Sequence, residues 1–291
     1  MDSLNPSDEN IKLLRNKLKI FIGTTILFVV LTVVFIITTI VGFSSKKTET
    51  IEVNKQWDTI PSESIIPVTT DIAVEGKIAD DSAAYYNRSA DVAKSRYYPT
   101  INFYDGNVTS TLKILPKFKT YQQSSAISCG DASAFMALRY FGIDTVSEYD
   151  LYKEAKTTYE FGTITSDLAN AITKLAGDKV TVVYQEEEKQ FTQDQFQDLV
   201  KECTDPSKNS ILLLESVEWG GHWMTLIGYD DMGTTETADD ILVFADPYDT
   251  TDHNQDGYYI VSFERYYATW FDHNILPEGH RGNQYIKISK K

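Results

Sequence analysis

Cysteine is scarce in this chain, since Cys129 and Cys203 are the only two among 291 residues. Two cysteines cannot form a disulfide framework, so the fold depends on a hydrophobic core, which a chain of this length can bury. Basic residues are also few, with 27 Lys and Arg against 42 Asp and Glu and a net charge of −15. This acidic balance excludes nucleic-acid binding, which requires a positive surface. No phosphate-binding P-loop pattern occurs either.

Charge is absent from one long segment, the 24 residues from Ile20 to Phe43. A helix needs about 20 apolar residues to cross a bilayer, whereas the core of a cleaved signal peptide has about 7–15. We therefore predict a transmembrane helix at residues 20–43. Four basic residues precede the span, so the positive-inside rule predicts a cytoplasmic tail at residues 1–19 and a body outside the cytoplasm. The expected location is the plasma membrane, as a single-pass protein.

Residues 44–110 are predicted to form a stalk and a partly ordered prelude, in which the aromatic residues of 80–104 dock on the body. From residue 111 to residue 291 the patterns are regular. Helical periodicity and capping signals predict helices near 129–141, 147–156, 168–176 and 192–203. Strand patterns follow at 180–184, 211–214, 223–229, 241–245, 258–263 and 285–288. Helices come early and strands late, so we predict an α+β domain.

Cys129 lies at the start of the first predicted helix. A helix N-terminus carries partial positive charge and favours a thiolate, the nucleophilic form of cysteine. A buried structural cysteine is the alternative, because cysteine is among the most buried residue types. Cys203 has the spacing of core residues on its helix, and we interpret it as a packing residue. We do not expect it to form a disulfide with Cys129.

A nucleophilic cysteine needs a base and a group that orients the base. His222 follows two glycines and opens an apolar strand, and the next strand ends at Asp246. Adjacent strands would bring Asp246 close to His222, where a carboxylate can orient the imidazole. An oxyanion donor is also needed. Gln123 is six residues before Cys129, and a loop of that length can place its amide near the thiol, whereas the neighbouring Gln122 is expected to point elsewhere.

The segment from Gln123 through Cys129-Gly130-Asp131 to Gly142 resembles the bacteriocin-processing (double-glycine) peptidases, a bacterial family of papain-like cysteine peptidases. Gly221-His222-Trp223 and Asp246-Pro247 show the same resemblance, which covers about residues 111–291. It implies a papain-like fold, with Cys129 as nucleophile, His222 as base, Asp246 as orienting group and Gln123 as oxyanion donor. The best-known members precede a multi-helix transporter and an ATPase in one chain. This chain looks like a stand-alone, membrane-anchored relative.

Three functions remain open on these grounds. The first is hydrolysis of peptide or amide bonds in a peptide or protein substrate, and the second is transfer of the same acyl group to an amine. The third is a catalytically silent binding module at the cell surface. No cofactor is implied. A calcium site at Asp252, Asn254 and Asp256 is a weaker candidate, because Phe263 replaces the acidic residue that a complete helix-loop-helix calcium loop requires.

Overall fold

The computed structural model describes residues 62–67, 78–86, 101–185, 189–217, 220–249, 256–270 and 281–291, with residues 13, 15, 17 and 278. The chain divides into two compact units, Met1–Val53 and Asn54–Lys291. The elements discussed below belong to the second unit. The predicted membrane span at residues 20–43 lies outside the described residues. Among the residues that are described, no helix is long and apolar enough to cross a membrane.

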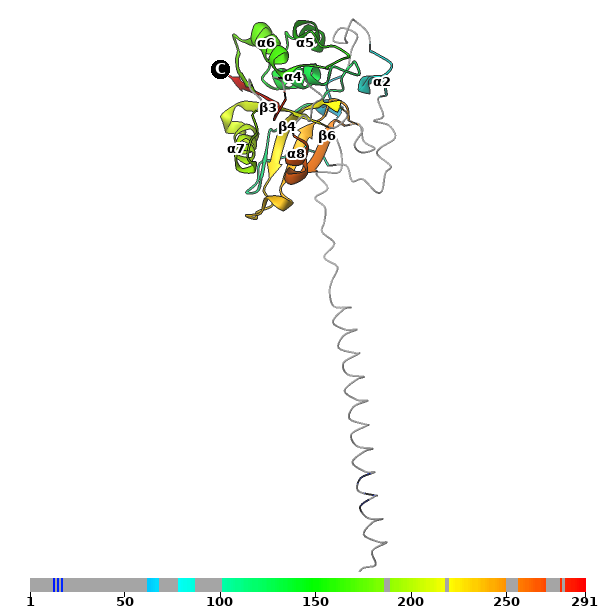
Figure 1. Cartoon of the computed structure of the whole chain (residues 1–291), viewed down its shortest axis with the longest axis vertical. Helices are drawn as coiled ribbons and strands as arrows, with labels where there is room; N and C mark the ends of the chain where they lie inside the picture. Colours follow the sequence, from blue (N-terminus) through cyan, green and yellow to red (C-terminus); the bar gives the residue numbers. More distant parts are fainter. Residues whose placement is uncertain are drawn as a thin grey trace, which may run out of the picture. The chain divides into compact units, whose positions relative to one another are not determined.

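An antiparallel sheet forms the centre of the second unit (Figure 1). Within the described residues, its strands follow the order β2-β7-β3-β4-β5-β6, and β1 pairs with the second half of β4. The strands are β1 Leu112–Ile114, β2 Val180–Tyr184, β3 Ser210–Ser216, β4 His222–Asp230, β5 Ile241–Ala245, β6 Tyr258–Ser262 and β7 Tyr285–Lys290.

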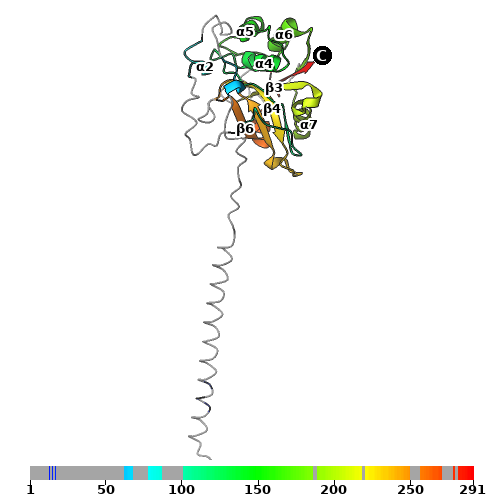
Figure 2. The same cartoon turned by 180° about the vertical axis from the view of Figure 1, so that it is seen from behind.

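Helices cover both faces of this sheet (Figures 1 and 2). The helices are α4 Cys129–Tyr140, α5 Glu148–Ala155 and α6 Thr165–Ala176 on one face, and α7 Gln193–Thr204 and α8 Phe263–Thr269 on the other. Strand β3 shows why two cores form, because Ile211 and Leu213 join the first core while Leu212 and Leu214 join the second. A strand buried on both faces has a continuous apolar sequence, as this one does. The predicted α+β class is confirmed.

Local signals place the helix boundaries. Ser147 begins α5 with a capping box that includes Asp150, and Thr192 begins α7 with the predicted box that includes Gln195. The structure differs from the prediction in two places. Strand β1 was not expected, and the final predicted strand position, Phe263, instead begins helix α8.

Parts of the predicted prelude lie against the domain. Residues 62–67 follow the main chain at Thr120, with Ile66 N donating to Thr120 O at 2.7 Å. Residues 78–86, which include the short helix α2 Ala83–Tyr86, contact the main chain at Gln123 and Ser124. There Ala84 N donates to Gln123 O at 3.1 Å. The expected docking of aromatic residues is seen for Phe103 and Tyr104, which are buried in the first core, but not for Tyr85, which is 60% exposed.

Candidate active site

Cys129 is the first residue of α4, at the end of the loop that begins with Tyr121. The side chain of Ser128, the N-cap residue, forms no capping hydrogen bond with the helix and instead donates to Glu148 at 2.6 Å. The positive end of α4 is therefore not covered by its own cap. Glycine is required next, because a Cβ at Gly130 would lie 2.8 Å from the Cβ of Thr163. The sequence Ser128-Cys129-Gly130 thus brings the thiol to a helix start against a closely packed loop.

His222 and Asp246 meet at the edge where β4 begins and β5 ends. The pairing of Thr225 with Ala245 brings Asp246 to the level of Met224, two residues from His222 in β4. Nε2 of His222 lies 2.7 Å from Oδ1 of Asp246, and the two side chains are only 12% and 3% exposed. The same carboxylate oxygen accepts a hydrogen bond from Tyr248 N at 2.8 Å. Nδ1 is therefore the ring nitrogen left to exchange a proton with Cys129.

The charge of His222 follows from these neighbours. Burial lowers the pKa of His222, but the charge and hydrogen bond of Asp246 raise it, and the nearby Cys129 raises it further. The resulting pKa is about 10. His222 is thus an imidazolium at neutral pH. A positive charge beside a thiol favours the thiolate, so the arrangement suits a nucleophilic cysteine.

Gln123 and Gln122 have different surroundings. The side chain of Gln123 lines the same cavity as Cys129, and its Nε2 donates to Ser125 O at 2.7 Å. Gln122 is not among the residues that line this cavity, and it makes hydrogen bonds of its own. Its Nε2 donates to Asp246 O at 2.9 Å, and its Oε1 accepts from Asp249 N at 3.1 Å. These two hydrogen bonds hold the main chain at residues 246–249, which includes Asp246, against the 121–128 loop.

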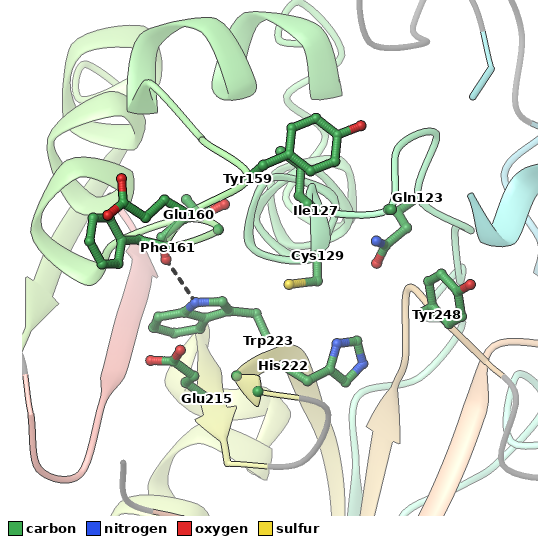
Figure 3. Close-up of a pocket in the computed structure, with 15 residues that line it drawn as sticks. Gln123, Ile127, Cys129, Tyr159, Glu160, Phe161, Glu215, His222, Trp223 and Tyr248 are labelled. Atoms are coloured by element: carbon green, nitrogen blue, oxygen red, sulfur yellow. Dashed lines mark hydrogen bonds between the residues drawn. The ribbon is translucent and has the colours of Figure 1, made fainter. Parts of the chain in front are cut away.

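A cavity of about 320 Å³ joins these groups (Figure 3). Gln123 and Cys129 reach it from the 121–128 loop and the start of α4, and His222 reaches it from the start of β4. The far wall is the 159–163 loop, which is held by a hydrogen bond from Trp223 Nε1 to Thr163 O at 3.0 Å. Thr157 and Thr163 also donate to Asp131, two residues after the thiol. A pocket of this size accommodates part of a peptide chain.

The family model described as Peptidase_C39 like family matches residues 116–272, more than half of the chain. The chain belongs to this family. The predicted resemblance is confirmed at the family level, and the arrangement of helices and antiparallel strands fits the α+β papain-like fold that it implies. All four candidate residues of this family member lie within the matched region.

Two solved structures match this chain at low identity. A protein described as a C39-like peptidase from Bacillus anthracis is 16% identical, and the match covers 62% of this chain and 98% of that chain with a TM-score of 0.42. UfSP from C. elegans is 8% identical, and the match covers 64% of this chain and 35% of that chain with a TM-score of 0.40. No curated protein matches this chain.

Cys203 differs from Cys129 in its surroundings. Both cysteines are free, so the expectation that they do not form a disulfide is confirmed. Cys203 is fully buried in the second core. Burial and the nearby Glu202 raise the pKa of its thiol to about 12, against a smaller opposing effect of Lys287. Cys203 is thus a packing residue with an unreactive thiol.

The calcium candidates are placed only in part. Asp252 and Asn254 lie outside the described residues. Asp256 is described, and its Oδ1 accepts a hydrogen bond from Tyr258 N at 2.8 Å, as in a polar turn. Among the residues that the structure describes, no three His, Cys, Asp or Glu side chains are grouped to hold a metal ion. The calcium site stays a prediction.

Sequence reasoning missed two groups at this site. Glu148 lies in the helix predicted near 147–156 and was not singled out, yet its carboxylate lies against the loop before Cys129. Gln122 was expected to have no role, yet it holds the Asp246 segment. A glutamate directly after a capping serine gives no local sign of burial, and the two hydrogen-bond partners of Gln122 are more than a hundred residues away.

Proposed function

We propose that this family member is a cysteine peptidase with Cys129 as its nucleophile and His222 as its general acid and base. Asp246 orients His222, and Gln123 donates to the oxyanion. The observation that supports this most strongly is the shared cavity, in which the thiol at a helix start faces an imidazole hydrogen-bonded to a buried carboxylate. A nucleophile, a base and an orienting group are the parts that covalent acyl transfer needs.

The reaction follows from the placement of these groups. The thiolate of Cys129 attacks the carbonyl carbon of a peptide bond, and the carbonyl oxygen becomes an oxyanion. The amide of Gln123 and the backbone N–H of Cys129 donate to that oxygen. The His222 imidazolium gives its proton to the leaving amine, and the C–N bond breaks to leave an acyl-enzyme. Neutral His222 then takes a proton from water, which attacks the acyl-enzyme, and the C–S bond breaks to release the acid and restore the Cys129 thiolate and the His222 imidazolium.

A peptide library tests this function. Full-length protein purified in detergent is expected to cleave some members of an unbiased library, and mass spectrometry of the products identifies the bonds. Products that carry an added amine, such as glycinamide supplied in excess, would mean acyl transfer instead. A sample whose Cys129 reacts with iodoacetamide but which cleaves no peptide would contradict the proposal and favour a silent binding module.

Replacing Asp246 with alanine is expected to lower the upper pH limit of activity. The raised pKa of His222 keeps the imidazolium present up to about pH 10. Without the carboxylate, burial dominates and the pKa falls. Each unit of that fall leaves about tenfold less imidazolium at pH values above the new pKa. The measurement is kcat/KM against pH from 5 to 11.

The same substitution also bears on stability. A raised pKa in the folded state means that protonated His222 stabilises the fold, fully below pH 6.5 and less as pH rises through about 10. Asp246→Ala should therefore reduce the melting temperature most at acid and neutral pH. Asp240→Ala is the matched control, because Asp240 is equally buried but bonds Gln197. An unchanged pH limit in Asp246→Ala, or an equal shift in the control, would contradict the assigned role.

The proposed location is the plasma membrane, with the domain outside the cytoplasm, and it is supported by the uncharged segment at residues 20–43 and the basic residues before it. A protease added to intact cells is expected to digest a C-terminally tagged domain, as an immunoblot would show. Protection that is lost only when the membrane is permeabilised would mean the opposite orientation.

A further inference from the structure

Glu148 is a fully buried carboxylate that serves no step of the proposed reaction. It is the first residue of α5, and four hydrogen bonds reach it from the 121–128 loop. Tyr121 Oη donates to Oε2 at 2.8 Å, and Ser128 Oγ donates to Oε1 at 2.6 Å. Ser124 donates twice, through its hydroxyl and through its backbone N–H.

This pattern fits an ionised carboxylate. A carboxylate has about four acceptor positions and no donor, and here four donors are directed at it. Burial raises the pKa of Glu148 above its ordinary value, and the hydrogen bonds from Ser124, Ser128 and Tyr121 offset only part of that rise. Burying a charge is costly unless such bonds compensate for it. All four donors come from one loop, so the conformation of that loop depends on this carboxylate.

The same loop carries the groups that the proposed reaction needs. Gln123 lies between Tyr121 and Ser124, and Cys129 directly follows Ser128. Because the hydroxyl of Ser128 is bound to Glu148, it does not cap α4, and the helix start remains open toward the cavity.

We infer that Glu148 is a positioning residue, which holds the 121–128 loop so that the Gln123 amide meets the developing oxyanion. This inference rests on the proposed function. On this inference, the oxyanion site is held in its reactive geometry by Glu148, a side chain that touches neither the substrate nor the nucleophile. A displacement of about 1 Å at a reacting centre can cost about 10² in rate.

Glu148→Gln tests the inference, because it keeps the shape of the side chain and removes its charge and one acceptor oxygen. With a substrate from the peptide library, we expect kcat to fall about 10²-fold and KM to change little. Alkylation of Cys129 by iodoacetamide forms no oxyanion, so its rate should fall far less than kcat does. In a Gln123→Ala background, adding Glu148→Gln should cost little more, since both changes remove the same contribution.

Ser147→Ala is the matched control, because it removes the cap of the same helix without touching the carboxylate. It should lower the melting temperature and leave kcat unchanged. If Glu148→Gln does not fold, Tyr121→Phe removes a single donor and should lower kcat without a large change in KM. Wild-type kcat in Glu148→Gln, or full additivity with Gln123→Ala, would overturn the inference. Failure of the proposed function can be told apart from failure of this inference, because the wild-type protein itself would then cleave no peptide.

Discussion

Replacing Cys129 with serine is expected to abolish turnover while the protein stays folded. The substitution exchanges one atom of similar size, so packing at the start of α4 is preserved. A hydroxyl cannot be held as an anion beside an imidazolium, whereas a thiol can, so the nucleophile is lost. The measurement is the rate of cleavage of a library substrate, with circular dichroism to verify the fold.

Cys203→Ser is the internal control for this experiment. It should retain activity, because Cys203 lies in the second core with no contact to the cavity. Burying a hydroxyl there should cost about 1–3 kcal/mol of stability if it finds no partner. Iodoacetamide at neutral pH should label Cys129 and spare Cys203. If Cys203 were required and Cys129 dispensable, the assignment of the nucleophile would be wrong.

The parts of the fold that could be predicted are those with local causes. Capping boxes at Ser147 and Thr192 and a continuous apolar run in β3 identify their elements without tertiary information. Strand β1 has three residues and depends on pairing with β4, so it has no local pattern of its own. Helix α8 was missed because its apolar start continues the pattern of β6, and only the cap at Ser262 marks the change.

The residues of the candidate site likewise divide into those that local sequence predicts and those that depend on tertiary contacts. Cys129, His222 and Asp246 occupy positions that follow from element boundaries, namely a helix start, a strand start and a strand end. The structure brings them together as that reasoning expected, although their roles remain proposals. Glu148 could not be predicted, since its donors become its neighbours only after α5 packs beside the loop. Long-range hydrogen bonds of this kind have no signature in sequence spacing.

Gln123→Ala is expected to lower kcat about 10²–10³-fold with little change in KM, because it removes one donor to the oxyanion. An oxyanion forms in the transition state and not in the bound substrate, so its loss affects turnover more than binding. The loss should be similar at every pH between 6 and 9, since the Gln123 amide does not titrate. A rise in KM with kcat unchanged would mean that Gln123 binds substrate instead.

Gln122→Ala gives the contrast that separates the two neighbours. Gln122 hydrogen-bonds the main chain at Asp246 and Asp249. Its removal should therefore make the position of the Asp246 carboxylate, which bonds His222, less fixed. We therefore expect a smaller loss at neutral pH and a downward shift of the upper pH limit, in the same direction as Asp246→Ala. The measurement is the pH profile of both glutamine variants under identical conditions. A pH-independent loss in Gln122→Ala as large as that in Gln123→Ala would show that the oxyanion donor is misassigned within this loop.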